Sequence, residues 1–443
     1  MATFLDASDR DRITAVATLL HRAARPVKIL RAIAWPDQVK ADFFAQGASA
    51  LPQVEYPAFD PQPVLDLVHA ARRDIFGGTA IDTWLERQAS ALETGARMLA
   101  GIGTAVFFEH SRRAYGEPTT PMRFDTETPL DLARQIQTVI QQLDHINLDI
   151  APPEFHAAEV VARQIETAVG QHFGDSAPEI QVVETLSANA LASASRIRLR
   201  QAARFTDRDA AQLIHHEAYI HVGTALNGQA QTALPILAAG HPGTTRTQEG
   251  LAVFAEIISG TIELNRFQRL ADRVFAIQMA VEGADFLQVY QYFLERTDQP
   301  DQAFESARRV FRGGVMTGGA PFTKDVVYLY GLLQVSTAIR AMFSAGRADC
   351  LLLLFCGKLD IYDLPALAEL TAAGLCELPR FVPPWVSDPR YLLALLTYST
   401  FMNQIESERA LATVKKLLEH TPIVELPARS NGNPWAVSPP SQG

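Results

Sequence analysis

The stretch HHEAYIH, residues 215–221, decides how the rest of this chain is interpreted. It lies in a segment that opens with TDRD, residues 206–209, a pattern typical of a capped helix N-terminus. His216 and His221 are five residues apart in the stretch. On a regular α-helix their side chains would point about 140° apart, because each residue turns the chain by about 100°. One metal ion therefore holds both imidazoles only if this helix is distorted.

Two distortions would bring the histidines together. If the turn is a π-bulge with i→i+5 hydrogen bonds, the angle between them falls to about 50°, and such bulges are frequent at functional sites. Alternatively, the helix unwinds just before Gly223, so that His221 swings in from its last turn. In either case Glu217 lies beside the pair, where its carboxylate would face a water molecule held by the metal.

A catalytic zinc ion takes three protein ligands, so a third ligand is needed. Glu249 follows His216 by 249 − 216 = 33 residues and lies early in a second predicted helix. Two histidines and a base on one helix with a glutamate on the next form a gluzincin arrangement. The sequence thus predicts Zn2+ on His216, His221 and Glu249, with Glu217 as the catalytic base. Glu256 shares a helix face with Glu249 and is expected to orient a ligand histidine.

Other interpretations of these residues stay open. A histidine pair can be buried and satisfied by backbone carbonyls, and a glutamate near a helix N-terminus can simply complement the helix dipole. The run HHE, residues 215–217, also fits the H-x-E element of zinc deaminases. These enzymes require P-C-x-x-C as well, and Cys350 and Cys356 have neither the proline nor the spacing, which excludes the class.

The string TQEGLAVFAE, residues 247–256, resembles the name-giving motif of the bacterial flavohaemoglobin expression-modulating QEGLA motif proteins. That family is related to the eukaryotic microtubule-associated tyrosine carboxypeptidases, zincin-like metallopeptidases that share H-E-x-x-x-H followed by E-G-L-A. The resemblance extends from about Trp35-Pro36 to PFTKDVVYLYGL, residues 321–332. It implies zinc on the same three residues, Glu217 as catalytic residue, and a peptidase whose eukaryotic relatives remove a C-terminal tyrosine.

Further groups are expected around an amide hydrolysis. The oxyanion needs a hydrogen-bond donor, for which Tyr328 is the candidate, with Tyr219 and His215 behind it. A carboxypeptidase also needs a cation for the terminal carboxylate of its substrate. Arg312 and Lys324 flank a Gly-rich stretch and are the predicted substrate-binding residues. Other cations considered for this role are Arg309 and Arg246.

These observations predict a zinc-dependent peptidase, specifically a carboxypeptidase acting on the C-terminus of a peptide or protein. The alternative is a regulatory zinc-binding protein, without catalysis or with weak catalysis, that affects the expression of other proteins, as the bacterial family's name suggests. The intact Glu217 argues against that alternative, because a binding protein has no need of the base.

The expected fold is mainly α with a small β-sheet (α+β) around a zincin-like, gluzincin core. Apolar residues at spacings of three and four predict helices over residues 13–30, 81–99, 130–143 and 157–169. Alternating or β-branched residues predict strands over residues 179–185 and 195–201, with the second as a candidate edge strand. The helix with the QEGLA string is expected to begin after Pro242-Gly243, with Thr245 as its cap. The expected regions are an N-terminal helical region (1–175), the catalytic core (176–345), a C-terminal helical region (346–428) and a disordered tail (429–443).

Composition places the chain among globular proteins, since 48% of its 443 residues are hydrophobic. The net charge is −10 and basic residues are scattered, so nucleic acid is not an expected partner. Three cysteines fit no disulfide framework, which favours a reducing cytoplasm. The N-terminus does not resemble a signal peptide, and the longest apolar run, residues 351–355, is too short to predict a membrane span. The oligomeric state and the residue preference are left open.

Overall fold

The computed structural model of the protein describes residues 5–123, 126–143, 154–184, 186, 189–297, 299–404 and 416. Most of these residues are helical and the strands are few and short, so the protein is mainly α with small sheets, as expected. The predicted tail at residues 429–443 and most of the chain between residues 405 and 428 lie outside the described residues. The division into an N-terminal, a core and a C-terminal region stays a prediction.

The segments with helical apolar spacing are all helices. They form α1 (Ala7–Ala24), α5 (Ala80–Ala100), α7 (Pro129–Leu143) and α8 (Ala158–Phe173). The first begins and ends six residues earlier than predicted, because Pro26 has no N–H to continue the helical hydrogen bonds and separates α1 from α2 (Ile29–Ala32). The neighbouring helices are α3 (Asp37–Ala45), α4 (Gln62–Arg72) and α6 (Ala105–Tyr115).

The predicted strands are found as β2 (Glu179–Val183) and β4 (Arg196–Arg200), which pair in parallel. The small-residue segment between them turns back as β3 (Ala190–Ser193) and pairs antiparallel with the other side of β4. The strand β4 is therefore central, and the prediction of an edge strand is wrong. Its alternation is as expected, since Ile197 and Leu199 are buried and Arg196 is exposed. Thr185, the predicted end of the first strand, lies outside the described residues.

Short elements connect this sheet to the helix that carries the histidines. A turn of 3₁₀ helix, η1 (Gly174–Ser176), follows α8, and β1 (His156–Ala157) pairs antiparallel with β5 (Arg204–Phe205). Thr206 then caps α9 (Asp207–Leu213) through a capping box with Asp209, as predicted. The chain continues into a π-helix, η2 (Ile214–Val222), and then into α10 (Gly223–Ala230). The π distortion is thus the one present, and the helix does not unwind before Gly223.

The helix with the QEGLA string, α11 (Pro242–Ile258), follows η3 (Pro235–Ala238) and starts earlier in the chain than predicted. Its N-cap is His241, whose side chain accepts a backbone N–H bond, and Thr244 completes the capping box. The prediction of Thr245 as cap is therefore wrong. Pro242 explains the shift, because proline suits the first helical position, where no N–H is needed. Glu249 consequently lies about two turns inside the helix.

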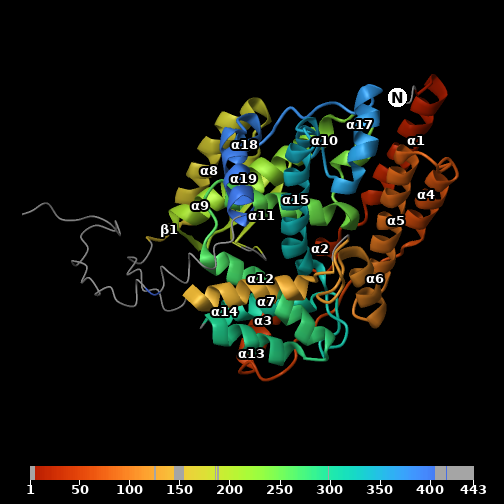
Figure 1. Ribbon diagram of the computed structural model, residues 1–443. Coiled ribbons are helices and arrows are strands. Elements are labelled where there is room, and N and C mark those ends of the chain that lie inside the picture. The colour runs from red at the N-terminus through yellow and green to blue at the C-terminus, as the bar shows by residue number, and fades with distance from the viewer. Residues whose placement is uncertain are drawn as a thin grey trace, which may run out of the picture.

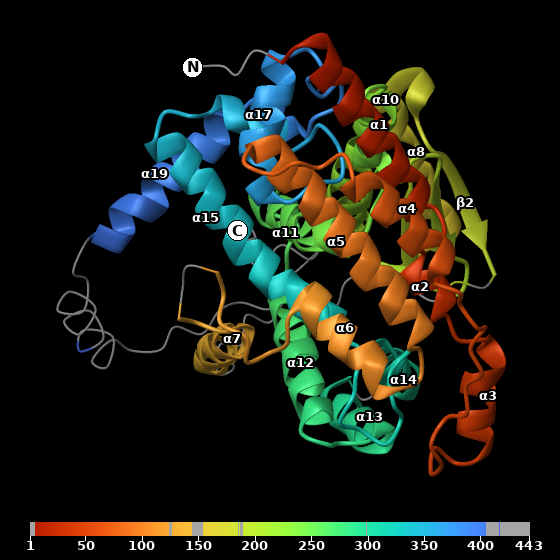
Figure 2. The ribbon, with the colours of Figure 1, turned by 90° about the vertical axis from the view of Figure 1, so that its right-hand side faces the viewer.

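The centre of the fold is the contact between α11 and α15 (Val327–Ser344). In Figure 1 this pair lies between α1, α4 and α5 on one side and α8 and α9 on the other. The turned view in Figure 2 shows the length of α15 passing close to α11. Every residue from Gln248 to Glu256 is buried except Glu249, which is half-buried. The predicted site therefore rests on one of the most enclosed segments of the chain.

Among the described residues, one segment, Lys324–Ser344, is long and apolar enough to pass a length-and-composition test for a membrane span. It consists of η4 (Lys324–Val326) and α15. Half of it, 50%, is buried inside the protein, and the core helix of a soluble protein passes the same test. Val335 and Ile339 are fully buried in the main core. Packing therefore accounts for the apolar character of this helix.

The other helices complete the two ends of the molecule. A second core of aromatic residues joins α3 to α12 (Leu264–Val281), α13 (Phe286–Thr297) and α14 (Pro300–Phe311). The chain then forms α16 (Asp349–Leu353), η5 (Ile361–Asp363), α17 (Leu364–Ala372), α18 (Pro384–Ser387) and α19 (Arg390–Gln404). The three cysteines, Cys350, Cys356 and Cys376, are free.

The predicted Gly-rich loop joins α14 to η4 and is fastened at both ends. The Tyr56 hydroxyl accepts hydrogen bonds from the backbone N–H of Gly313 at 2.8 Å and from the Trp35 indole at 2.6 Å. At the other end, Ser111 and Thr323 share a buried hydrogen bond of 2.9 Å between their hydroxyls. These contacts fix the positions of the basic residues that flank the loop.

Candidate metal centre

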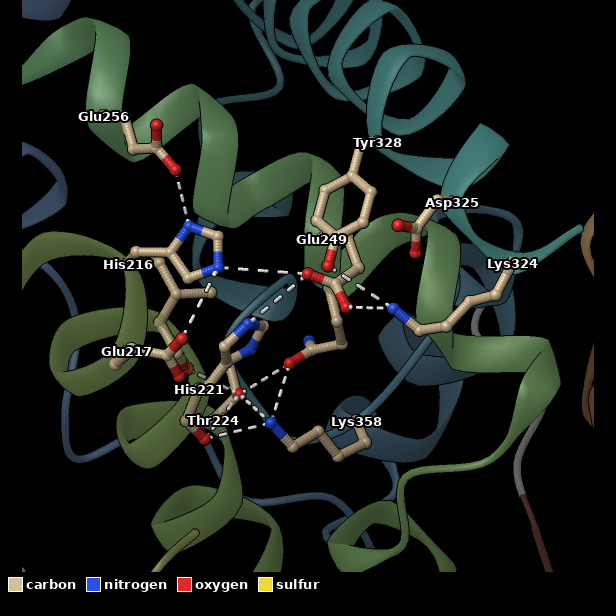
Figure 3. A network of polar contacts seen from close by, with 12 residues as sticks. His216, Glu217, His221, Thr224, Glu249, Glu256, Lys324, Asp325, Tyr328 and Lys358 are labelled. Carbon is tan, nitrogen blue, oxygen red and sulfur yellow. Dashed lines mark hydrogen bonds and ion pairs between the residues drawn. The ribbon is translucent and has the colours of Figure 1, made fainter. Parts of the chain in front are cut away.

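The three predicted metal ligands lie together. Ligand atoms of His216, His221 and Glu249 all lie within 4.8 Å of one another. Glu249 Oε2 is 3.9 Å from His216 Nε2 and 3.7 Å from His221 Nε2. Figure 3 shows the two imidazoles and the carboxylate facing one another across the gap between η2 and α11. The described part of the chain thus contains a side-chain cluster that could hold a metal ion.

The π-helix explains how histidines five residues apart come to share one face. In a regular α-helix they would diverge by about 140°, whereas i→i+5 hydrogen bonds widen the turn and place such residues nearly above one another. The ring centroids of His216 and His221 are 5.0 Å apart, with the rings tilted by 79°. Because α11 packs against η2, Glu249 approaches both rings from the neighbouring helix.

Glu256 fixes the orientation of His216, as its position on α11 predicted. His216 Nδ1 lies 2.7 Å from Glu256 Oε1. Burial alone would raise the pKa of Glu256, but Arg266 and the bond to His216 lower this pKa to about 2. An ionised carboxylate only accepts hydrogen bonds, so Nδ1 donates and Nε2 is the ring nitrogen that faces Glu249. Nε2 is therefore the atom of His216 that would bind a metal ion.

Glu217, the predicted base, borders the cluster. Its Oε1 lies 3.9 Å from His216 Nε2, and its side chain is 17% exposed. No hydrogen-bond donor is bonded to its carboxylate in the part of the chain that the structure describes, so both oxygens are able to accept a proton. The residue therefore stands where a base would meet a water molecule reaching the cluster from solvent.

Lys324 holds the other oxygen of Glu249. Its ammonium donates to Glu249 Oε1 at 2.7 Å and is almost fully buried. Burial alone would raise the pKa of Glu249, but Lys324 and the two histidines lower it well below its usual value. Glu249 is thus kept as a carboxylate whose Oε2 faces the imidazoles. The sequence assigned Lys324 to substrate binding, which stays a prediction, and the structure adds this contact with a predicted ligand.

The Tyr328 hydroxyl lies beside this ion pair and points towards Glu249 (Figure 3). It accepts hydrogen bonds from Lys324 Nζ at 3.4 Å and from Arg309 Nη2 at 3.5 Å. Arg309 itself binds both oxygens of Asp325, at 2.6 and 3.0 Å. Within the described residues no group accepts the proton of the Tyr328 hydroxyl. That proton is therefore available to a bound substrate.

The remaining predicted cations differ in what they contact. Arg246 stacks on Tyr330, at 3.9 Å from the ring centroid, and is thereby engaged. Arg312 is half-buried, its Nε has no hydrogen-bond partner, and no carboxylate lies within ion-pair distance of it among the described residues. Burial and the nearby Arg309 lower the pKa of the Arg312 guanidinium to about 10, so it is still a cation at neutral pH. Arg312 thus lies over the Phe322 ring and has no paired carboxylate among the described residues.

The alternative oxyanion donors, His215 and Tyr219, pack elsewhere. The Tyr219 ring contacts His215 and the His172 ring of α8, with centroid distances of 5.2 and 4.5 Å. These contacts place both side chains on the side of η2 that faces α8. Tyr328 is therefore better placed than either residue to serve the cluster.

Lys358 is a buried residue of the site that sequence reasoning missed. From the loop between α16 and η5, its ammonium donates to the His221 carbonyl oxygen at 2.9 Å, to Thr224 Oγ1 at 2.9 Å and to Gln248 Oε1 at 2.8 Å. Burial lowers its pKa to about 7, although two nearby glutamates oppose this. It lies 137 residues from His221, so no local spacing connects them. The only signal is a lone lysine in the apolar run CLLLLFCGKL, residues 350–359.

The donor set of the cluster fits a zinc ion. Two imidazole nitrogens and one carboxylate oxygen form a known set of protein ligands for catalytic zinc. The 3.7 and 3.9 Å separations from Glu249 Oε2 are slightly shorter than two zinc–ligand bonds of about 2.1 Å each, so one ion can span each pair. The bond from His216 to Glu256 supplies the outer support that such histidine ligands usually have.

Comparison with known protein families matches residues 41–404 to the family described as "Microtubule-associated tyrosine carboxypeptidase". Comparison with curated proteins found no match. The matched range contains the whole cluster and Lys358, and agrees with the relationship that the QEGLA string indicated. Because the match covers most of the chain, this protein belongs to the microtubule-associated tyrosine carboxypeptidase family.

Proposed function

We propose that this protein is a zinc-dependent carboxypeptidase that hydrolyses the last peptide bond of a peptide or protein. The observation that carries the proposal is the cluster of His216, His221 and Glu249, whose ligand atoms lie within 4.8 Å of one another. Membership of a family named for carboxypeptidases supports the reaction class. The family's name gives tyrosine as the residue removed, and a tyrosine-like C-terminal residue is the first substrate to test.

The proposal includes the architecture around the cluster. Two histidines and a base on η2, with a glutamate on α11, follow the order of a gluzincin site. We therefore assign the sheet, η2 and α11 to a zincin-like catalytic core. The three free cysteines suit the cytoplasmic location that the sequence predicts, because disulfides are rare in that compartment.

The chain's own residues divide the reaction between them. When bound at the cluster, zinc would polarise the scissile carbonyl and acidify the attacking water. Glu217 takes the proton from that water and passes it to the leaving amine, since its carboxylate is unbonded and faces the cluster. Glu256 keeps His216 in the tautomer that presents Nε2. Lys324 keeps Glu249 ionised and oriented by holding its Oε1.

Two further groups bind the substrate. Tyr328 donates a hydrogen bond from its hydroxyl to the oxyanion. Its O–H is free for this bond because Arg309 and Lys324 both donate to the hydroxyl oxygen. Arg312 and Lys324 form the positive side of the site for the terminal carboxylate. Arg312 lies over the Phe322 ring, 5.7 Å from its centroid, and Phe322 precedes Lys324 by two residues, so both cations flank the same short segment. Arg312 is the principal ligand, since Lys324 already pairs with Glu249.

Metal analysis tests the site before any substrate is known. The purified protein is expected to hold about one zinc ion per chain, and His216→Ala to hold much less. Wild-type protein without zinc after exposure to the metal would reject the proposal.

Glu217→Gln then separates catalysis from binding. The amide keeps the shape of the side chain but removes the base, so we expect zinc to be retained and hydrolysis to fall by at least 10²-fold. Activity is measured as release of C-terminal residues from a peptide library by mass spectrometry. Unchanged hydrolysis in Glu217→Gln would show that another group is the base. A zinc-loaded wild type that cleaves no peptide would favour the regulatory alternative.

A further inference from the structure

The ammonium of Lys358 makes three hydrogen bonds, all to neutral groups. Its partners are the His221 carbonyl at 2.9 Å, Thr224 Oγ1 at 2.9 Å and Gln248 Oε1 at 2.8 Å. An ammonium has three N–H donors, so all are used. No carboxylate lies within ion-pair distance of it among the residues that the structure describes. The amino group of Lys358 therefore points at a backbone carbonyl and two polar side chains.

Each of these partners belongs to a helix that carries predicted metal ligands. His221 is itself a predicted ligand near the end of η2, and Thr224 follows in the first turn of α10. Gln248 lies on α11 immediately before Glu249. Figure 3 shows Lys358 reaching between the two helices beside His221 and Thr224. One side chain thus ties the helix with the histidines to the helix with the glutamate.

The π-helix ends at these bonds. The Thr224 hydroxyl lies 2.6 Å from the Ile220 carbonyl oxygen and 2.8 Å from Gln248 Oε1. Lys358 bonds the next carbonyl, that of His221. A π-helix is rare and persists where local contacts support it. Side-chain donors at the last carbonyls of η2 supply such contacts where the widened turn returns to a regular helix.

Lys358 is held in place independently of the cluster. Its backbone N–H donates to the Leu237 carbonyl of η3 at 2.7 Å. A Cβ on the preceding Gly357 would lie only 2.6 Å from the same oxygen, so the loop and η3 are in backbone contact. On the other side, the N–H of Ile361 donates to Thr247 Oγ1 of α11 at 3.1 Å. The ammonium therefore projects from a fixed support.

We propose that Lys358, with Thr224 and Gln248, is a positioning clamp that sets the width of the π-helical turn at His221 and its distance from Glu249. Lys358 touches neither substrate nor metal, and acts through the backbone of one predicted ligand and the neighbour of another. The inference rests on the proposed metal site for its functional meaning, but the clamp itself has consequences in the metal-free protein.

Lys358→Met tests the clamp, because methionine keeps an unbranched chain but has no N–H donors. In the metal-free protein, hydrogen exchange followed by mass spectrometry is expected to become at least tenfold faster across residues 214–222. Zinc affinity, measured by chelator competition, is expected to fall by about 10–100-fold, the usual effect of losing a group that orients a ligand. The absorption spectrum of the cobalt-loaded protein is expected to change, since the ligand geometry differs.

Gln231→Met is the matched control. Gln231 tethers the same loop, donating to the Cys356 carbonyl at 3.2 Å and to the Glu377 carbonyl at 2.8 Å, without touching η2 or α11. It is expected to lower the unfolding temperature but to leave zinc affinity, the cobalt spectrum and exchange across residues 214–222 unchanged. Equal loss of affinity in both variants would reduce Lys358 to an ordinary structural residue and overturn the proposal.

The outcomes separate this inference from the metal site. If wild type binds zinc and Lys358→Met binds it equally well with unchanged exchange, the clamp is rejected and the metal site stands. If wild type binds no zinc, the metal site is rejected, while faster exchange in Lys358→Met still shows the clamp. Should Lys358→Met not fold, Thr224→Val, which exchanges the hydroxyl for a methyl group of similar size, is measured instead. A several-fold loss of zinc affinity supports the clamp, and unchanged affinity overturns it.

Discussion

Gly250 of α11 and Gly331 of α15 are in direct backbone contact. A Cβ on Gly250 would lie 2.3 Å from the Gly331 carbonyl oxygen and 2.8 Å from its Cα. A Cβ on Gly331 would in turn lie 2.3 Å from the Arg246 carbonyl oxygen. The glycine of the QEGLA string is therefore needed for close packing of the two central helices, and this packing sets the position of the adjacent Glu249.

Gly250→Ala is expected to destabilise the protein and weaken metal binding. The added methyl group meets backbone that cannot rotate away, so the helices must separate, at a cost of about 1–3 kcal/mol or more. Glu249 moves with α11, so zinc affinity is expected to fall as well. Denaturant unfolding and chelator competition measure the two effects.

Gly170→Ala is the control for that substitution. Gly170 lies inside α8, and nothing lies within 4 Å of an added Cβ. Alanine there is expected to stabilise the protein by about 0.5–1 kcal/mol, because it favours the helix. Destabilisation by both substitutions would contradict the role of the close approach at Gly250.

Glu256→Gln is expected to reduce both metal affinity and stability. It leaves the buried Arg266 without its carboxylate partner, which costs about 3–5 kcal/mol. It also replaces a carboxylate that only accepts hydrogen bonds with an amide that can donate as well, so the tautomer of His216 is no longer fixed and zinc affinity is expected to fall by about 10–100-fold. Unfolding in denaturant and zinc titration are the measurements. Asp82→Asn, which breaks the buried pair with Arg12 between α1 and α5, should lower stability only.

His241 is expected to make stability depend on pH. Burial and the nearby Lys28 lower its pKa from 6.5 to about 4, so the folded protein keeps the imidazole neutral. Between those pH values the unfolded chain binds a proton that the folded one does not. The contribution of His241 to the free energy of unfolding is therefore fully present above about pH 6.5. It falls by about 3 kcal/mol in total as the pH drops to about 4.

His241→Asn isolates that contribution, because asparagine still caps a helix but does not titrate in this range. The difference in unfolding free energy between wild type and His241→Asn should change by about 1.4 kcal/mol per pH unit between pH 6 and 4.5. A difference that stays constant over this range would mean that His241 has the same pKa in the folded and the unfolded chain.

Arg312→Ala is expected to affect substrates with a free C-terminus selectively. Losing the charge-assisted bonds to the terminal carboxylate should raise KM at least tenfold for a peptide acid, and change it little for the corresponding amide. Arg347→Ala, which removes an exposed arginine paired with Asp349, serves as control. Equal effects of Arg312→Ala on acid and amide would remove Arg312 from substrate binding.

The features predictable from the sequence are those that depend on local spacing. The five-residue separation of His216 and His221 is incompatible with a regular helix, and this conflict predicted either a π-bulge or an unwound helix end, of which the structure contains the first. Thr206 and Asp209 likewise define their helix start without help from the rest of the chain. The contact of Glu256 with His216 followed from its place on one face of α11.

The features that escaped prediction depend on distant or competing contacts. Lys358 meets His221 across 137 residues of chain, and no periodicity encodes that approach. β4 has an exposed arginine that suits an edge, yet β3 folds back onto it and makes it central. The start of α11 was misplaced because two capping patterns overlap there, and Pro242 decides in favour of His241.

The widened turn of η2 has a consequence for how such sites are recognised. This chain has one more residue between its two metal-facing histidines than the H-E-x-x-H motif has. The widened turn keeps the two imidazoles close in space, although the motif is longer in sequence. Searches written for the shorter H-E-x-x-H string pass over proteins built in this way. The additional residue also rotates every later residue about the helix axis, including Thr224, which bonds at the end of the turn. Deleting one residue here would therefore change the direction of the side chains at the end of the helix more than it would change the two histidines.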